Sequence, residues 1–181
     1  MKKMMITATI LLLMLCFNNV SYARPMDANM IKEQMIKDWK RAKDFTKEYL
    51  DAMPADKYGF KAVDSIRSFA QQMLHLANGT VFLSGSALDQ KSIFTTNLEA
   101  SPTAVTKDSV TYYVMASYDF VINGLQKLDA IKLNEKVSLM NFSEPRYVLI
   151  DKAFEHQTHH RGQATIYIRL VGIRPPGEKL F

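Results

Sequence analysis

The sequence has a single cysteine, Cys16, among its 181 residues. Because Cys16 lies in an apolar N-terminal segment, the rest of the chain can neither form a disulfide nor use a thiol of its own as a nucleophile. Only seven glycines are present, and none belongs to a phosphate-binding GxGxxG or Walker-type motif. No basic run with interleaved aromatic residues occurs either, so the sequence gives no reason to expect a nucleic-acid partner.

Residues 1–23 have the pattern of a secretory signal peptide. Lys2 and Lys3 form a basic start, Ile6 to Phe17 is an uncharged apolar run, and Ser21-Tyr22-Ala23 offers small residues for cleavage. A retained membrane anchor is the alternative, but the run is shorter than the roughly 20 residues that cross a bilayer. We therefore expect an exported protein, periplasmic or extracellular, that keeps no stable membrane span after processing.

Cleavage after residue 23 removes two basic residues and no acidic ones. The formal net charge of +5 then becomes +3, from 21 basic and 18 acidic side chains. This balance is ordinary for a globular protein. With no disulfide to help, stability must come from the apolar core and from any metal ion that the fold binds.

Residues 24–181 are expected to form one domain of four long helices. Apolar residues recur there at spacings of three and four, with charged residues on the remaining faces. Asp27, Asp64 or Ser65, and Thr106 are candidate N-terminal caps. The predicted helices are Asp27–Met53, Asp64–Ser84, Lys107–Leu133 and Pro145–Val171. Four long helices with short connections predict an all-α four-helix bundle.

Two connecting segments stand apart from the helical pattern. Ala87 to Thr106 has no sustained period, so it is either a functional lid or a long crossover between helices. Lys136 to Phe142 has some strand character, but a lone strand cannot form a sheet. Within the second helix, Gly79 is expected to weaken the helix and Gly85 to end it.

Histidine is the residue type whose placement suggests chemistry. His156 and His160 are four residues apart on one predicted helix, so their imidazoles share a face and can share one metal ion. His159 also shares a face with His156, and spacing alone does not choose between His159 and His160. His75 is the remaining candidate for a third ligand. It lies on a polar seam beside the apolar stripe of its own helix.

Three stretches of sequence together resemble the DinB-like family. Residues 156–163 read HQTHHRGQ, which is similar to the family's HxxxHRGQ signature, and residues 170–176 resemble its closing Gly-x-x-Pro-Pro turn. Arg67-Ser68-Phe69 followed by Met73-Leu74-His75-Leu76 resembles its second-helix ligand region. The resemblance extends from Met30 to Pro176.

This resemblance implies a fold, a metal site and a set of ligands. The fold would be an up-down-down-up four-helix bundle, often dimeric. The site would hold a divalent metal ion, most often nickel or zinc, on His75, His156 and His160, with His159 not a ligand. An export signal departs from the mostly cytoplasmic, thiol-linked members of the family, which puts a low-molecular-weight thiol substrate in doubt.

Four further residues are candidates for the surroundings of this site. Arg161 and Gln163 would either contact a substrate or hydrogen-bond to neighbouring groups and so hold His160 in place, and the second role is the more common one for residues beside a ligand. Asn78 and Tyr167 lie about one turn from His75 and His160, and either could line an open metal position. For Tyr167, packing in the core is the simpler explanation.

Two classes of function agree with these residues. An open three-histidine site could activate a bound water or a substrate for hydrolysis or group transfer on a small molecule. The same bundle could instead hold a metal or a ligand without turnover. A third reading, histidines with no metal at all, is the least favoured. The sequence does not indicate a substrate.

Overall fold

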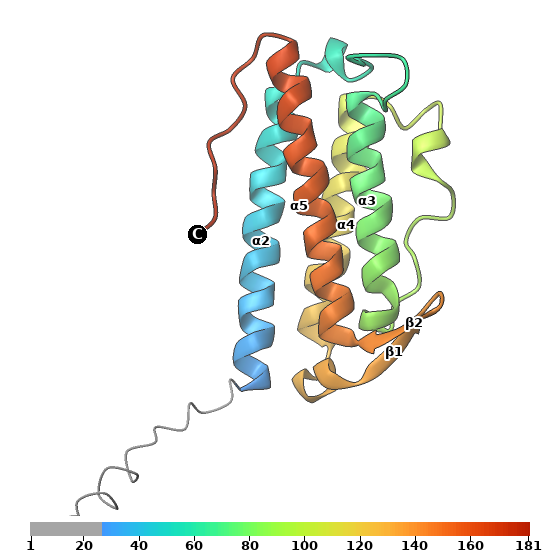
Figure 1. Ribbon diagram of the computed structural model, residues 1–181, viewed down its shortest axis with the longest axis vertical. Coiled ribbons are helices and arrows are strands. Elements are labelled where there is room, and N and C mark those ends of the chain that lie inside the picture. The colour runs from blue at the N-terminus through green and yellow to red at the C-terminus, as the bar shows by residue number, and fades with distance from the viewer. Residues whose placement is uncertain (1–26) are drawn as a thin grey trace, which may run out of the picture.

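The computed structural model describes residues 27–181 and contains an all-α four-helix bundle. The predicted signal peptide, residues 1–23, lies outside the described residues. The helices run up, down, down and up, as Figure 1 shows, and the predicted fold class is confirmed. Their bounds are α2 Ala28–Ala52, α3 Phe69–Gly85, α4 Lys107–Lys127 and α5 Arg146–Leu170. None of the helices in residues 27–181 is both long enough and apolar enough to cross a membrane.

Side chains cap three of these helices at their N-terminal ends. Asp27 accepts a hydrogen bond from the Asn29 backbone at 3.1 Å, and Thr106 accepts one from Ser109, as the sequence predicts. The predicted start of the second helix at Asp64 is wrong. Helix α3 begins at Phe69, where Ser68 and Gln71 form a capping box.

The preceding loop explains this late start. The backbone carbonyls of Tyr58 and Phe60 accept hydrogen bonds from the N–H groups of Ala70 and Phe69, so the loop occupies the donors of the first turn. Residues 61–67 therefore run along the end of the bundle in turns. This placement brings Arg67 close to the histidines of the bundle.

The predicted end of the third helix at Leu133 is also wrong. Helix α4 ends at Lys127, because Leu128 is extended, and a short 3₁₀ helix, η4 (Ala130–Asn134), follows. The strand-like segment does not stand alone either. β1 (Lys136–Leu139) pairs antiparallel with β2 (Phe142–Pro145) in a hairpin that leads into α5.

The core of the bundle lies between the four helices. Trp39 is 1% exposed and packs edge-to-face against Tyr118 of α4 and Phe154 of α5, which joins three helices around one indole ring. α3 packs mainly against α5 and α4, so it is central to the bundle. The pair α3 and α5 carries all four histidines.

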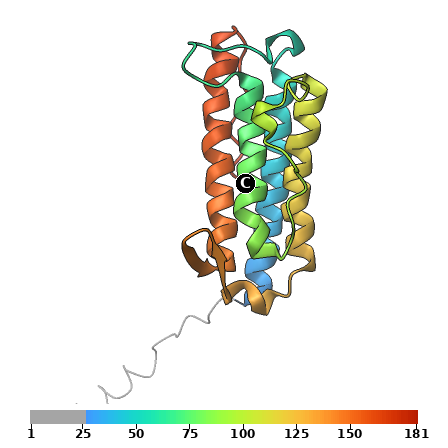
Figure 2. The same ribbon diagram turned by 90° about the vertical axis from the view of Figure 1, so that its right-hand side faces the viewer.

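The segment between α3 and α4 crosses the whole length of the bundle. Two parallel neighbouring helices need such a crossover, and it lies along the surface beside α3 (Figure 2). It contains two 3₁₀ turns, η2 (Ser86–Leu88) and η3 (Leu98–Ala100). The prediction that this segment is a long crossover between helices is therefore correct.

At the other end of the chain, the tail after α5 returns along α2, where Arg41 donates to the Lys179 carbonyl at 2.7 Å.

Candidate metal centre

Three histidines converge between α3 and α5. His75 comes from α3, and His156 and His160 come from successive turns of α5. One ring nitrogen from each lies within 4.8 Å of the other two. The ring centroids are 4.4 Å apart for His156 and His160, 4.5 Å for His75 and His160, and 5.3 Å for His75 and His156. The fold therefore brings together the three residues that the sequence selected.

A glycine on α3 makes room for one of these rings. A Cβ atom at Gly79 would lie 2.1 Å from Cε1 of His156, closer than any real contact. The imidazole of His156 thus packs directly on the backbone of α3. The sequence suggested only that Gly79 weakens its helix, since nothing local shows that a ring from α5 takes the space.

A carboxylate from the crossover supports His75. Glu99 of η3 lies with one oxygen 2.6 Å from Nδ1 of His75, while Arg67 Nε donates to its other oxygen at 2.7 Å. An Nδ1–H that donates to Glu99 leaves Nε2 of His75 as the metal-binding atom, the arrangement found in carboxylate–histidine–metal sites. Burial raises the pKa of Glu99, but the hydrogen bonds from Arg67 and His75 outweigh it and hold that pKa below its usual value.

Sequence reasoning did not find Glu99 or Arg67 as parts of the site. The sequence pattern places Arg67 inside the predicted second helix, although that helix begins only at Phe69, and a long irregular stretch separates Glu99 from His75. For Glu99 the only signal in the sequence is the length of the crossover, and for Arg67 it is the resemblance of Arg67-Ser68-Phe69 to the family's second-helix ligand region. The crossover between α3 and α4 therefore also has a place in the site, because one of its side chains, Glu99, contacts His75.

Two glutamines surround His160. Nδ1 of His160 lies 3.1 Å from Oε1 of Gln163 and 2.8 Å from Nε2 of Gln72, and Gln72 also donates to Gln163. In the tautomer whose Nδ1–H donates to Gln163, Nε2 is left for a metal, and the Gln72 amide donates to Gln163 rather than to the ring. Gln163 therefore has the orienting role considered for it from the sequence, and Gln72 of α3 is an addition that sequence reasoning missed.

The electrostatics of the site favour neutral imidazoles. Burial, with a smaller effect of positive neighbours, lowers the pKa of both His156 and His160 to about 4. Neutral imidazole is the form that ligates metal ions. Nδ1 of His156 is buried and has no hydrogen-bond partner among the described residues, an arrangement that is costly without a further group. Three neutral imidazoles fit a divalent ion with an open coordination position. The unpaired ring nitrogen of His156 is consistent with such a group.

The fourth histidine lies apart from this group. His159 is exposed on α5 and accepts a hydrogen bond from Gln163 Nε2 at 3.0 Å. It is not among the residues whose ring nitrogens converge. The tertiary structure thus separates His159 from His160, which spacing alone did not do.

Asn78 and Tyr167 occupy different surroundings. Asn78 lines a hollow of about 380 Å³ beside His75, and its amide donates to Asn97 of the crossover at 3.1 Å. Tyr167 is 7% exposed, packs edge-to-face on Phe69, and donates its hydroxyl to the Arg67 carbonyl at 2.8 Å. Tyr167 therefore holds the Arg67 loop in place and packs in the core.

Arg161 turns away from the histidines into the bundle. It is 6% exposed, and it donates to Gln157 at 2.8 Å and to Thr46 at 3.3 Å, with its guanidinium 4.7 Å from the centre of the Phe45 ring. Tyr118 joins the same network through a 2.7 Å hydrogen bond to Gln157. Gln157 and Arg161 follow His156 and His160 in sequence, so the network fixes the rotation of α5 that presents both rings.

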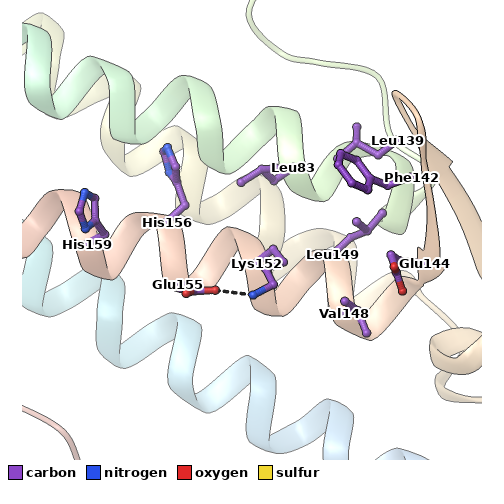
Figure 3. Close-up of a pocket in the computed structure, with 10 residues that line it drawn as sticks. All are labelled: Leu83, Leu139, Phe142, Glu144, Val148, Leu149, Lys152, Glu155, His156 and His159. Atoms are coloured by element: carbon purple, nitrogen blue, oxygen red, sulfur yellow. Dashed lines mark hydrogen bonds and ion pairs between the residues drawn. The ribbon is translucent and has the colours of Figure 1, made fainter.

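Two larger hollows flank the histidines on the α3–α5 face. One has a volume of about 630 Å³, reaches His156 and His159, and is lined by apolar side chains of α3, α5 and the hairpin together with charged side chains at its rim (Figure 3). The other, about 670 Å³, lies toward the opposite end of the helices and is bordered by polar groups that include Arg67, Gln72 and Gln163. The first hollow therefore borders His156 directly, whereas the second borders residues that contact His75 and His160.

A four-helix bundle with three converging histidines defines a class of candidate metal-binding proteins. The chain belongs to the DinB family, whose model matches residues 25–180. No curated protein matches it. Family and fold therefore agree.

Solved structures support the same fold. A DinB-like protein from Bacillus cereus is 16% identical, with a TM-score of 0.72 over 81% of this chain and 97% of that one. A DinB-like protein from Bacillus subtilis, also 16% identical, has a TM-score of 0.61 over 82% and 96%. A conserved protein from Enterococcus faecalis, 19% identical, has a TM-score of 0.64 over 78% and 96%. At these identities the likeness concerns the fold alone.

Proposed function

We propose that this protein binds one divalent metal ion, nickel or zinc, through His75, His156 and His160 and uses it in hydrolysis or group transfer on a small molecule. The observation that carries the proposal is the convergence of three ring nitrogens within 4.8 Å. Each neighbouring group has a definable part: Glu99 and Gln163 orient the rings of His75 and His160, and Gly79 admits the ring of His156.

A bound ion would supply Lewis-acid activation of a water or of a substrate oxygen or sulfur atom. The side chains around it bind and orient. Gln72 and Gln163 hold His160, and the Arg67–Glu99 pair holds His75, while the two flanking hollows leave space for a substrate.

A non-catalytic binding protein is the second candidate, favoured by a separate observation. The carboxylates beside the histidines are both engaged, Glu99 with Arg67 and His75, and Glu155 with Lys152 at 2.7 Å. Hydrogen bonding to Lys152 lowers the pKa of Glu155, which makes it a weak base. Among residues 27–181, no unengaged carboxylate accompanies the three histidines.

Metal content tests the first part of the proposal. The protein, purified without a histidine tag, is expected to contain or take up about one equivalent of nickel or zinc by mass spectrometry. The double variant His156→Ala/His160→Ala is expected to contain almost none, while His159→Ala is expected to match the wild type. Equal and substoichiometric metal in all three proteins would contradict the site.

Export is a further part of the proposal. It rests on the signal-like pattern of residues 1–23. Expression of the full chain in a bacterial host is expected to give a processed protein that begins at Arg24 and fractionates outside the cytoplasm. An intact N-terminus in the cytoplasmic fraction would contradict export without affecting the metal site.

A further inference from the structure

The hollow of about 630 Å³ beside His156 forms a groove that ends at the histidines. It lies where the β1–β2 hairpin packs beside the first turns of α5 and the last turns of α3 (Figure 3). Its apolar lining, which we call the hairpin groove, consists of Leu83, Leu139, Phe142, Val148 and Leu149. His156 lines the same hollow and is also one of the three converging histidines.

Much of this apolar surface is open to water. Phe142 is 65% exposed, and Leu83, Leu139 and Val148 are only half-buried. A folded chain gains nothing from presenting several large apolar side chains around one hollow. Concave apolar surface of this size, next to a few polar groups, is typical of a small-molecule site.

The groove is elongated. Along α5, Val148 and His156 are eight residues apart, which corresponds to about 12 Å of helix. The apolar side chains lie toward the hairpin, with the carboxylate of Glu144 at their edge, and the imidazole of His156 lies at the other end. An occupant must therefore have a long apolar part and a polar part at one end.

The charged residues at the rim of the groove determine where the polar part of an occupant binds. Lys152 and Glu155 pair with each other at 2.7 Å, and both are exposed. Glu144 adds a carboxylate at the hairpin end, which disfavours an anionic group there. Because Lys152 is already paired, the residues that line the groove offer no free lysine or arginine to an anionic group. The strongest attraction for an anion would come from an ion held by the three neutral imidazoles, since it keeps its full positive charge.

We propose that the ligand or substrate class of the site is a small amphiphile with an unbranched alkyl chain in the hairpin groove and an anionic, metal-binding head group beside His156. This inference rests on the proposed metal site. It adds a substrate class that three histidines alone do not indicate.

Two hydroxamates that share a head group and differ in chain length test this inference. Octanohydroxamate and acetohydroxamate both chelate zinc and nickel through the same atoms. Binding to the metal-loaded full-length protein is measured by calorimetry below the micelle concentration. The longer probe is expected to bind at least about tenfold more tightly, because burial of several methylene groups favours it.

Two substitutions locate the chain within the groove. Phe142→Asp and Val148→Asp are expected to reduce the preference for octanohydroxamate at least about fivefold, while acetohydroxamate affinity stays unchanged. Phe142 is exposed, so its replacement should not impair folding. Tyr112→Asp is the matched control, because Tyr112 is a 69% exposed aromatic residue on α4 and does not line the groove.

Each alternative result has a defined meaning. Equal affinity for the two probes, or a preference that neither groove substitution changes, would overturn the amphiphile inference while the metal site stands. Equal binding of octanohydroxamate to metal-free protein would overturn the placement of the head group. A wild-type dimer that Phe142→Asp dissociates would show that a second copy covers the groove, which also overturns the inference. Failure of the protein to load metal would refute the proposed function itself.

Discussion

Glu99 places a carboxylate oxygen 2.6 Å from Nδ1 of His75, although the two residues belong to different segments of the bundle. Arg67 binds the other oxygen of the same carboxylate at 2.7 Å. The crossover is therefore tied to the histidine cluster through a single side chain. A partner of this kind fixes the orientation of a ligating imidazole and increases its basicity.

Glu99→Gln is expected to weaken zinc or nickel binding about 10- to 100-fold, because the amide is a poorer acceptor for the Nδ1–H of His75. Competition with a coloured chelator measures the affinity. Glu155→Gln is the control, since Glu155 pairs only with exposed Lys152. Equal affinities for Glu99→Gln and wild type would show that Glu99 has no orienting role.

Gly79→Ala separates helix propensity from site geometry. Propensity alone favours alanine by up to about 1 kcal/mol. The new Cβ would lie 2.1 Å from the His156 ring, so we expect the ring to be displaced, with a loss of metal binding and no gain in stability. Gly162→Ala on α5 is the control, because a Cβ there meets nothing within 4 Å. Normal metal binding by Gly79→Ala would show that His156 has another productive position.

Acidification is expected to destabilise the metal-free protein. Burial lowers the pKa of His156 and His160 from 6.5 to about 4, so between these pH values the unfolded chain binds more protons than the folded chain. This contribution to stability is complete above pH 6.5 and is lost as pH falls toward 4, by about 2–4 kcal/mol. Urea unfolding at pH 7 and pH 4.5 with a chelator present measures it.

The double variant His156→Ala/His160→Ala provides the comparison for this pH dependence. Carboxylates also titrate in the same range, but they are common to both proteins. The double variant should lose less stability than the wild type on the same acidification. Parallel pH profiles for the two proteins would show that these imidazoles are not protected from protonation in the fold.

Arg161→Met is expected to destabilise the fold by about 1–3 kcal/mol, because Gln157 and Thr46 lose a buried charged donor. The methionine keeps part of the apolar volume over Phe45. Thermal or urea unfolding measures the change, and Arg169→Met on the exposed face of the same helix should have little effect. Unchanged stability together with loss of a small-molecule affinity would favour the substrate-contact role instead.

Helical periodicity accounts for the parts of the fold that were predicted correctly. The existence of α2, α3, α4 and α5 follows from apolar residues that repeat every three to four positions, a pattern each helix carries by itself. Boundaries failed where distant groups intervene, as at Phe69, whose backbone N–H bonds to the Phe60 carbonyl. The hairpin was missed because Lys136 to Phe142 reads as one strand-like segment, whereas it contains β1, the turn and the first residue of β2.

By itself the sequence determined that His156 and His160 face the same way, because their relation depends only on the turn of one helix. Likeness to a family then suggested His75. Only the tertiary structure decided that Glu99, Arg67 and Gln72 support these rings, that Gly79 makes room for one of them, and that an apolar groove ends beside them. These are contacts between separate segments, and their positions depend on how the whole bundle packs.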